Sequence, residues 1–483
     1  MERKYIEDLK DYVGEEVFIN GFVWVKRDQG KIVFFDFKDA TGTVQAVAHS
    51  GNPEAVEKSK EVKHQWTVEV RGKVKERPEK MRTEDLNGSI ELELLDIEVI
   101  SKAKELPFDV TEDTSDIDEN LRLKYRYLDL RSERMQRNIR LRSQFVQKCR
   151  EYLFGQKFTE IETPILTEST PEGSRDFVVP SRLHLGKFYA LPQSPQQYKQ
   201  LLMTAGFEKY FQIARAIRDE DLRADRGFEH SQIDIELSFV ARDQVIELVE
   251  EMMTKTVESM GYSIKEKPFP RISYKEALDR FGDDKFDLRT EEEKEKGILS
   301  YAWVVDFPFF EKTDNGDWTF SHNPFSQPKE EHVETLLKIA ERVDNGENPR
   351  DIDEIGEILT TQYDLVCNGF ESGGGSIRAH KPEVLRATYK AMGMDDDYIE
   401  KSVGHMLEAF EFGTPPHGGI ALGIERNIMN LSGEDALREV QAFPMTRGGH
   451  TSVMQGPSEI SEKQLKELGI SIKRKDTEAK SFH

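Results

Sequence analysis

The sequence predicts an α+β protein in which a small N-terminal β-barrel precedes a larger domain of mixed strands and helices. Residues 1–104 contain short runs rich in Val, Ile and Phe, separated by turns that contain Gly and Asp. Residues 105–133 change from acidic to basic, as expected of a hinge followed by an entry helix. From residue 140, apolar residues recur at helical spacing and are followed by a mixture of strand-like and helix-like segments.

The composition is that of a charged globular chain. The 483 residues include 68 Lys and Arg against 91 Asp and Glu, which gives a formal net charge of −23. At roughly 150 residues per domain, this length predicts two to four domains. There is no run of about 18 apolar residues, so no membrane-spanning helix and no membrane partner are expected. Cys149 and Cys367 are far apart, and the N-terminus lacks the apolar segment of a signal peptide, so we expect a cytoplasmic protein.

The first hundred residues contain four or five short strand-like runs. This number of strands in so short a segment suggests a small closed barrel, and the OB-fold is a common barrel of this kind that binds oligonucleotides. A purely structural β-domain is the alternative that the pattern leaves open. The negative net charge does not exclude a nucleic acid, because phosphate binding depends on local basic patches.

The second domain is expected to open with a helix that ends at Gly155. The segments YFQIARAIRDE (210–220) and SQIDIELSFV (231–240) are predicted to be two strands joined by a charged loop. IALGIERNIMNL (420–431) is predicted to run from a strand into a helix. The polar segment 290–300 is expected to be a short surface connection.

The predicted hairpin at 211–238 contains the most informative charges. Arg218 and Glu220 end its first strand, and Asp234 and Glu236 alternate on the returning strand, so they share one face. Guanidinium groups pair with phosphate oxygens, and carboxylates pair with an ammonium group. The hairpin therefore suits a triphosphate beside an ammonium-bearing ligand. A salt-bridged surface hairpin is the alternative.

Two further segments carry candidate binding residues. YDLVCNGFESGGGSIRAH (363–380) has three consecutive glycines between Glu371 and Arg378, which permit close approach of a ligand to the backbone. GTPPHGGIALGIER (413–426) places Arg426 near the start of a helix, where phosphate groups are favoured. The alternatives are a flexible glycine turn and an ordinary surface arginine.

Taken together, these segments resemble motifs 2 and 3 of the class II aminoacyl-tRNA synthetases, and the 140–158 helix with FTEIETPIL resembles motif 1. Other segments narrow the resemblance to aspartyl-tRNA synthetases of the bacterial type, and the match runs from about residue 3 to about residue 470. These segments are TPEGSRDFVVPSR (170–182), ALPQSPQQYKQLLM (190–203), RDEDLRADR (218–226), SQIDIE (231–236), WVVDFP (303–308), NGFESGGGSIR (368–378) and GTPPHGGIALGIER (413–426).

The resemblance implies an aspartate–tRNA ligase. Such an enzyme activates L-aspartate with ATP to aspartyl-adenylate and transfers the aspartyl group to the 3′ end of tRNA(Asp), while tRNA(Asn) stays open as a second substrate. It also implies an OB-fold barrel fused to an antiparallel sheet of six to seven strands flanked by helices, and a homodimer formed through motif 1. The implied domains are 1–104 for the anticodon, 105–135 as a hinge, 136–445 for catalysis, and 446–483 as an extension and tail.

The resemblance also assigns site residues one by one. In the reaction itself, Arg218 would contact the α-phosphate, Glu220 the adenine amino group and Arg426 the γ-phosphate. The full set implied for ATP is Arg218, Glu220, Arg226, His230, Glu371 and Arg426, with Asp364 and Glu371 as ligands of Mg²⁺. The set implied for aspartate is Glu172, Ser194, Gln196, Lys199, Gln232, Asp234, His322 and Arg378, and the set implied for the anticodon is Arg27, Phe34 and Gln45.

The sequence departs from the usual pattern at several positions. His230 stands where the family has the phenylalanine that stacks on adenine, and Asn323 stands where it has a second histidine. Glu425 precedes the motif 3 arginine in place of an aspartate. A domain of more than a hundred residues, usual before WVVDFP, is essentially absent near residues 285–300. Gln29 matches neither residue that the family uses to choose between tRNA(Asp) alone and both tRNAs.

Three other interpretations compete with this one. A synthetase for asparagine or lysine is disfavoured by Arg378, since a lysine substrate requires an acid at that position. A catalytically inactive paralogue that binds RNA is disfavoured by the retained set Arg218, Glu220, Asp364, Glu371 and Arg426. An enzyme that amidates aspartate on the same core is disfavoured by the presence of the N-terminal barrel.

Overall fold

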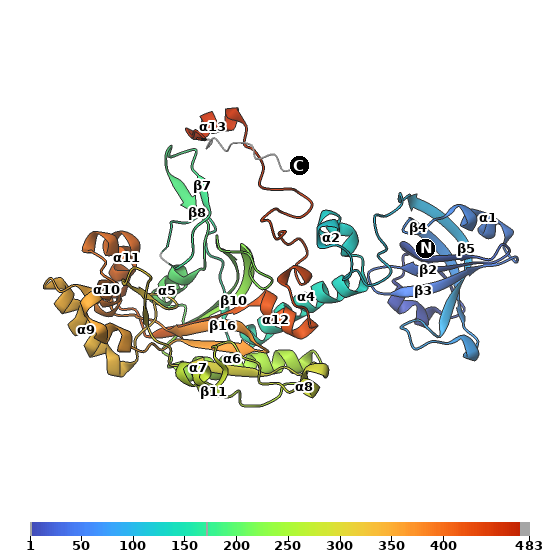
Figure 1. Ribbon diagram of the computed structural model, residues 1–483. Helices are drawn as coiled ribbons and strands as arrows, with labels where there is room; N and C mark the ends of the chain where they lie inside the picture. Colours follow the sequence, from blue (N-terminus) through green and yellow to red (C-terminus); the bar gives the residue numbers. More distant parts are fainter. Residues whose placement is uncertain (1, 171, 474–483) are drawn as a thin grey trace. The chain divides into compact units, whose positions relative to one another are not determined.

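The computed structural model describes residues 2–170 and 172–473 (Figure 1). Contacts within the chain divide it between Ile117 and Asp118 into two compact units. Each unit has a hydrophobic core of its own, and each is described separately below.

The first unit is a closed five-stranded barrel in the order β1-β2-β3-β5-β4, so the predicted small barrel is confirmed. Burial alternates along the strands, as in β2 and β3, where every second side chain enters the core. The core is formed within residues 6–97. The strands are β1 (Glu16–Asp28), β2 (Val33–Lys38), β3 (Thr43–Ala48), β4 (Thr67–Glu76) and β5 (Ile90–Ser101), with helix α1 (Pro53–Glu61) between β3 and β4.

The second unit begins with two short helices, α2 (Glu119–Lys124) and α3 (Arg126–Asp129), followed by the long helix α4 (Glu133–Gly155). Ser132 caps α4, because its hydroxyl accepts a hydrogen bond from the Met135 N–H at 3.5 Å. The helix ends at Gly155, as predicted. Its buried side chains recur every three or four residues and form one apolar stripe.

An eight-stranded sheet forms the centre of this unit, in the order β11-β12-β15-β16-β17-β10-β9-β6 (Figure 1). The six inner strands are antiparallel, and the two outermost pairs are parallel. We expected six to seven strands; the outermost strands have only two and three residues, too few to show alternation in the sequence. The strands are β6 (Thr159–Glu160), β9 (Lys209–Ile217), β10 (Glu229–Ser238), β11 (Arg271–Ser273), β12 (Tyr301–Val305), β15 (Tyr363–Cys367), β16 (Phe370–Ile377) and β17 (His417–Gly423).

One face of the sheet packs against helices α4, α6 (Arg242–Ser259) and α12 (Ile424–Ser432) in a single apolar core. Ile233 and Ile235 of β10 point into this core and are fully buried. Burial of this kind contributes about 1.5–3 kcal/mol for each large apolar side chain. Because side chains alternate along a strand, the residues between these isoleucines face the opposite side of the sheet.

The remaining elements surround the free face and edges of the sheet. Helices α9, α10 and α11 form a separate apolar cluster with the β13–β14 hairpin. The connection between α7 and β12 contains the short helix α8, in the segment that was expected to be a surface connection. The elements are β7 (Val178–Pro180), β8 (Phe188–Ala190), α5 (Gln196–Thr204), α7 (Tyr274–Phe281), α8 (Glu291–Glu295), β13 (Phe310–Lys312), β14 (Trp318–Phe320), α9 (Glu330–Asp344), α10 (Pro382–Ala391), α11 (Asp396–Glu411) and α13 (Glu462–Leu468).

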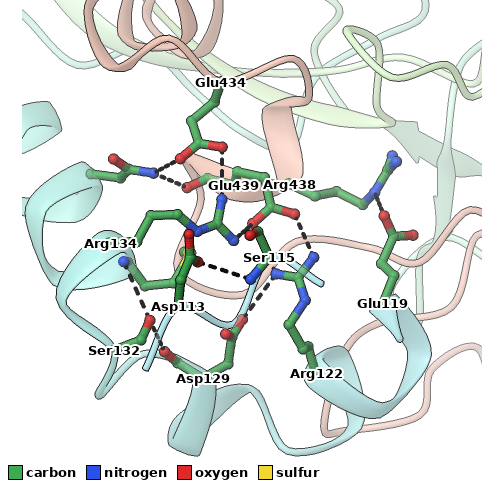
Figure 2. Close-up of polar contacts among 12 residues, drawn as sticks. Asp113, Ser115, Glu119, Arg122, Asp129, Ser132, Arg134, Glu434, Arg438 and Glu439 are labelled. Atoms are coloured by element: carbon green, nitrogen blue, oxygen red, sulfur yellow. Dashed lines mark hydrogen bonds and ion pairs between the residues drawn. The ribbon is translucent and has the colours of Figure 1, made fainter. Parts of the chain in front are cut away.

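A buried ion network ties the opening helices of this unit to the segment that follows α12 (Figure 2). Both oxygens of Glu439 accept hydrogen bonds from the Arg122 guanidinium at 2.9 Å, and Arg134 donates to Glu439 at 2.7 Å and to Glu434 at 2.7 Å. Burial would raise the pKa of Glu439, but these arginines outweigh it and lower the pKa to about 2. Glu439 is therefore ionised at neutral pH.

The extension after α12 returns to the β7–β8 hairpin. Arg182 of the hairpin turn lies 3.8 Å from Glu467 of α13. The Leu185 side chain lies 3.6 Å from the position that a Cβ on Gly469 would take. Residues 474–483 of the predicted tail lie outside the described part of the chain. Among residues 2–170 and 172–473, no helix combines the length and the apolar content needed to cross a bilayer.

Candidate active site

The inner face of β10 carries three polar side chains into the free side of the sheet. Gln232, Asp234 and Glu236 alternate with the core isoleucines, and the two acids are fully buried. Gln232 donates to Asp234 at 3.1 Å. The same-face arrangement predicted for Asp234 and Glu236 is confirmed, whereas the alternative of a surface hairpin is wrong, because this strand lies at the centre of the sheet.

Two buried cations neutralise these acids. The Lys199 ammonium, from α5, lies 2.6 Å from Asp234 and 3.2 Å from Glu236. Arg378, which follows β16, donates to both oxygens of Glu236 at 3.0 Å and 3.3 Å. Burial raises the pKa of Asp234, although Lys199 opposes it, whereas Arg378 and Lys199 outweigh burial and lower the pKa of Glu236. The cluster is close to charge balance before any ligand enters.

Lys199, Gln232, Asp234 and Arg378 line a cavity of about 370 Å³, and Glu236 lies beneath these residues without lining it. Every residue that the sequence assigned to ATP, aspartate or the metal lines this cavity, except Asp364. The lining includes Glu172, Ser194, Gln196, Lys199, Arg218, Glu220, Arg226, His230, Gln232, Asp234, His322, Glu371, Arg378 and Arg426. Residues from six different stretches of sequence therefore meet around one space.

Arginines border one side of the cavity. Arg218 directly follows β9 and donates to the Gln193 carbonyl at 3.2 Å. Arg226 lies 3.5 Å from Glu220, and Arg426, in the first turn of α12, lies 3.4 Å from Glu371 and 3.2 Å from Asp225. These pairs are long or partly exposed, so an incoming polyanion can replace the carboxylates as partner of the guanidinium groups.

His230 lies in this arginine-bordered part of the cavity. Burial lowers the pKa of His230 to about 3, and the nearby charges of Arg218 and Arg426 act in the same direction. The imidazole is therefore neutral at physiological pH. A neutral aromatic ring beside two guanidinium groups can stack on a planar base without adding a further positive charge.

Glu425, in the first turn of α12, contacts two other elements of the second unit, β10 and α4. Its carboxylate accepts the Ser231 N–H at 3.0 Å and lies 2.9 Å from the Arg142 guanidinium of α4. Glu425 also directly precedes Arg426 on α12. The departure from aspartate to glutamate at this position therefore keeps a carboxylate that is fully used in hydrogen bonds.

The loop before β7 covers another side of the cavity. Glu172 accepts hydrogen bonds from Ser194 at 2.5 Å and from Thr170 at 2.9 Å, and burial raises the pKa of this carboxyl group. Gly173 follows with φ at +97°, a backbone conformation that glycine adopts without strain. Glu172 lines the cavity, and Gln193 bonds to both the Ser174 N–H and the Ser174 carbonyl, at 3.0 Å and 2.9 Å.

The three glycines of β16 lie inside a strand, so the alternative of a flexible glycine turn is wrong. A Cβ on Gly375 would lie 2.1 Å from the Gly419 carbonyl of β17, which shows that this glycine permits close strand pairing. A Cβ on Gly374 would lie 2.9 Å from Asp364 and 3.5 Å from Glu371. Gly374 thereby keeps open a space between the two acids expected to bind a metal.

Asp364 lies behind the cavity wall rather than on it. Gln362 donates to one carboxylate oxygen of Asp364 at 2.7 Å, and His322 lies 3.5 Å from the other. The Asp364 contact outweighs burial and raises the pKa of His322. Among the described residues, no group of three or more His, Cys, Asp or Glu side chains has metal-binding geometry, so a cation here would depend on the two acids together with other oxygen donors.

In the barrel, Arg27, Phe34 and Gln45 lie on three adjacent strands. Arg27 of β1 is paired with Phe34 of β2, and Gln45 of β3 is paired with Asp36 of β2. Phe34 and Gln45 belong to the outward-facing set of their strands, and the Arg27 side chain is 55% exposed and lies 3.5 Å from Asp36. The three candidates therefore form one outward-facing patch on the barrel, in which Phe34 and Gln45 are half-buried.

Sequence reasoning missed several residues of the cavity. Gln362, Asn323, Asp225 and Glu425 line it without having been proposed as ligand contacts. For Gln362 a signal was present: it stands two positions before Asp364 and directly before β15, and period-two alternation puts such residues on the same face.

Residues 118–447 match the family described as tRNA synthetases class II (D, K and N). This match spans more than half of the chain. The chain belongs to the class II aminoacyl-tRNA synthetases. Residues 17–100 match the OB-fold nucleic acid binding domain, which identifies the five-stranded barrel as an OB-fold.

Curated relatives extend over nearly the whole synthetase. One, from Syntrophomonas wolfei, is named aspartate–tRNA(Asp/Asn) ligase and is 36% identical over 588 aligned positions, which cover 96% of this chain and 98% of the relative. A second relative of the same name, from Natranaerobius thermophilus, is 37% identical and covers the same shares. Because the chain has only 483 residues, more than a hundred aligned positions have no counterpart in it. This agrees with the missing inserted domain.

Solved structures share the fold of the synthetase. Asparaginyl-tRNA synthetase from Pyrococcus horikoshii, complexed with asparaginyl-adenylate, superposes with a TM-score of 0.69 at 24% identity, covering 92% of this chain and 98% of that chain. A putative aspartyl-tRNA synthetase from Leishmania major superposes with a TM-score of 0.71 at 20% identity, covering 92% and 93%. The class II sheet and barrel predicted from the sequence are therefore confirmed.

Proposed function

We propose that this synthetase is an aspartate–tRNA ligase that joins L-aspartate to tRNA(Asp). The observation that carries the proposal is the pair of buried cations, Lys199 and Arg378, at the floor of a cavity bordered by arginines. The named relatives support the same substrate. We assign anticodon binding to residues 1–104, the hinge to 105–135, catalysis to 136–445, and the extension to 446–483.

In the first step, a carboxylate oxygen of aspartate attacks the α-phosphorus of ATP. A new oxygen–phosphorus bond forms as the bond to the β-phosphate oxygen breaks, which yields aspartyl-adenylate and pyrophosphate. Arg218 neutralises charge at the α-phosphate, and Arg226 and Arg426 hold the outer phosphates. Positioning and charge neutralisation account for most of catalysis in such a step, and no protein nucleophile takes part.

The adenosine part of ATP would lie against His230. The neutral imidazole stacks on the adenine, and Glu220 accepts a hydrogen bond from the adenine amino group. Glu220 is already held by the Ser174 hydroxyl and by Arg226, so its orientation is fixed before the nucleotide binds.

Arg378 and Lys199 would bind the side-chain carboxylate of aspartate, while Asp234 and Gln196 hold the ammonium group. Gln232, Ser194 and His322 complete the pocket, and Glu172 closes over it. Asparagine is disfavoured because its neutral amide leaves buried positive charge without a partner. This difference separates the proposed enzyme from the asparaginyl relatives of the same fold.

The residues around Gly374 fit a magnesium ion bound together with ATP. Asp364 and Glu371 approach the space that Gly374 leaves open, and Mg²⁺ prefers one or two carboxylates completed by phosphate oxygens and water. When bound, the ion would neutralise charge on the phosphates. Glu371 also orients Arg426, whose Nη1 donates to the Glu371 carbonyl at 3.1 Å.

In the second step, the aspartyl group passes from the adenylate to a ribose hydroxyl of the terminal adenosine of tRNA. We assign anticodon reading to the barrel patch: Phe34 stacks on a base, Gln45 reads a base edge, and Arg27 contacts the loop backbone. Stacking and edge hydrogen bonds are how proteins read unpaired RNA bases.

We further propose that the enzyme is a homodimer that works in the cytoplasm. A groove of about 840 Å³ runs beside α4, in the region that resembles motif 1, and includes the exposed rings of Phe154 and Phe443. A second copy of the chain would cover it. Light scattering at micromolar concentration is expected to give twice the chain mass, and Phe443→Glu is expected to give monomers.

The two cysteines are buried and form no disulfide, as suits the reducing compartment proposed here.

Aspartylation of tRNA(Asp) and tRNA(Asn) transcripts, measured side by side with ATP and Mg²⁺, tests the proposal. Charging of tRNA(Asp) alone would identify a discriminating enzyme, and charging of both would identify a non-discriminating one with Gln29 compatible with that choice. Charging of neither by folded protein would refute the proposal and favour an inactive paralogue that binds RNA.

A further inference from the structure

Gln193 is a buried glutamine whose side-chain amide bonds to the loop before β7. It lies between β8 and α5 and is only 2% exposed. The amide oxygen accepts the Ser174 N–H at 3.0 Å, and the amide nitrogen donates to the Ser174 carbonyl at 2.9 Å and to Asp176 Oδ1 at 2.6 Å. A glutamine amide offers one acceptor oxygen and two N–H donors, so each of these groups is used to hold this loop.

The residue that follows Gln193 holds the same loop at a second point. The Ser194 hydroxyl donates to the Glu172 carboxylate at 2.5 Å. Glu172 and Ser174 stand on either side of Gly173, whose φ of +97° gives the loop its bend. Two consecutive residues therefore fix both neighbours of this glycine, and the position of Glu172 in the cavity depends on both of them.

The main chain of the same segment contacts the phosphate side of the site. The Gln193 carbonyl accepts a hydrogen bond from Arg218 Nε at 3.2 Å, and the Pro192 carbonyl accepts the Ile217 N–H at 2.9 Å. These acceptors are backbone oxygens, which any residue at position 193 retains. A change of the Gln193 side chain is therefore expected to release the loop and to leave Arg218 in place.

We propose that Gln193 is a positioning residue for aspartate, whose side chain keeps Glu172 in place over the amino acid. If the binding-competent arrangement of a site is populated only in part, the apparent affinity falls by that fraction. Loss of the Gln193 amide should thus raise KM for aspartate. The value of kcat should stay, because the groups proposed to act on the α-phosphate are held by the backbone. The inference rests on the proposed function, because it concerns the aspartate end of the same site.

Aspartate-dependent ATP–pyrophosphate exchange by Gln193→Met tests the proposal. Methionine keeps the length of the side chain and removes its hydrogen bonds, so KM for aspartate is expected to rise at least about tenfold. A change confined to binding leaves kcat and KM for ATP within about threefold of wild type. Gln136→Met is the matched control, because Gln136 also donates to a backbone carbonyl, that of Leu130 at 2.7 Å, but does not line the catalytic cavity. It should leave all three constants unchanged.

A reciprocal pair of substitutions tests whether the effect acts through this contact. Gln193→Glu places a carboxylate against Asp176 and the Ser174 carbonyl, so KM for aspartate should rise more than in Gln193→Met. Asp176→Asn alone should stay within about threefold of wild type, because its amide oxygen still accepts a hydrogen bond from Gln193. In the double variant the new amide can donate to the new carboxylate, and KM should return to within about fivefold of wild type.

Hydrogen–deuterium exchange of residues 172–176 gives a readout that does not depend on activity. Uptake should be faster in Gln193→Met, because the Ser174 N–H loses its acceptor. Unchanged uptake, an aspartate KM within twofold of wild type, a fall in kcat without a change in KM, or no recovery in the double variant would each overturn the role of Gln193, while an active wild type leaves the proposed function standing. A folded wild type without aspartate-dependent exchange would end both. Should Gln193→Met not fold, an unchanged aspartate KM in Asp176→Ala overturns the inference.

Discussion

Arg378 and Glu236 form a buried two-point pair, with guanidinium nitrogens 3.0 Å and 3.3 Å from the two carboxylate oxygens. The pair holds the guanidinium in one orientation before substrate arrives. Lys199 shares the same carboxylate at 3.2 Å. The cations proposed to bind aspartate are thus anchored by the protein, so little rearrangement is needed when the substrate enters.

Replacement of Arg378 by Ala is expected to abolish aspartate activation. The pocket loses its forked cation and leaves Glu236 with only Lys199 as a partner, so kcat/KM for aspartate should fall by at least about 100-fold. Aspartate-dependent ATP–pyrophosphate exchange measures this directly. Arg342→Ala, which removes an exposed arginine paired with Glu347 and Glu354, is the control and should leave exchange unchanged. Exchange near the wild-type rate in the Arg378 variant would contradict the assignment.

Glu236→Gln is expected to weaken the binding of aspartate and to leave the binding of ATP unchanged. The carboxylate lies beneath the two cations and does not face the arginine-bordered side, so its loss disorders Arg378 and Lys199 only. KM for aspartate should rise about tenfold, in line with the loss of one charge-assisted hydrogen bond. KM for ATP should change less than about twofold, since none of the residues proposed to bind ATP is altered. Equal increases in both constants would indicate a general loss of structure.

His230→Ala is expected to raise KM for ATP by about tenfold, because one stacking contact with a base contributes about 1–3 kcal/mol. His230→Phe should restore KM to within about threefold of wild type. Because the pKa of His230 is lowered to about 3, the imidazole stays neutral between pH 5.5 and 8. The pH profiles of KM for ATP should therefore be parallel in the wild type and the Phe variant. If KM for ATP changes near pH 6.5 in the wild type but not in the Phe variant, the imidazole titrates there and is not neutral throughout this range.

Glu439→Gln is expected to destabilise the catalytic unit by about 3 kcal/mol at pH 7. The pKa of Glu439 is lowered from its usual 4.5 to about 2, and a shift of this size corresponds to about 3 kcal/mol. A carboxyl group with a lowered folded-state pKa stabilises the fold fully above about pH 4.5, and this contribution is lost as pH falls toward 2. Urea unfolding at pH 7, 5 and 4 measures the free energy of unfolding of both proteins. The difference between wild type and variant should be the same at pH 7 and 5 and become smaller only at pH 4. Glu276→Gln, in an exposed pair with Arg280, should cause no measurable change.

Phe34→Ala is expected to impair charging of tRNA and to spare adenylate formation. Loss of one stacked base should lower kcat/KM for tRNA(Asp) by about tenfold or more. ATP–pyrophosphate exchange without tRNA should stay at the wild-type rate, because Phe34 belongs to a unit with its own core. A parallel loss of exchange would contradict the assignment of anticodon reading to this patch.

Local sequence patterns correctly predicted the strands and helices that contribute residues to the cavity. The hairpin of β9 and β10, the strand-to-helix change at β17 and α12, and the end of α4 at Gly155 all follow from alternation, helical periodicity or a helix-ending glycine. What these patterns lack is pairing over long distances. Arg122 and Glu439 are 317 positions apart, and nothing in either segment alone indicates that they meet.

The same limit applies within the site. Lys199 and Asp234 were expected near aspartate from the resemblance, but their direct contact at 2.6 Å depends on how α5 packs on the sheet. The covering of Asp364 by Gln362 could be suspected from their spacing of two residues. The bonds from Gln193 to the Ser174 backbone could not, because they are a property of the packed fold rather than of a sequence pattern.

The barrel closes its own core within residues 6–97 and carries its exposed patch on strands β1, β2 and β3. If the barrel reads the anticodon as proposed, choice of tRNA is a portable property of this chain. Exchange of residues 1–117 for the barrel of a relative with the opposite tRNA preference should carry that preference across, while the amino acid accepted stays aspartate. Mutations in the barrel could thus change which tRNA the enzyme aminoacylates without changing which amino acid it attaches.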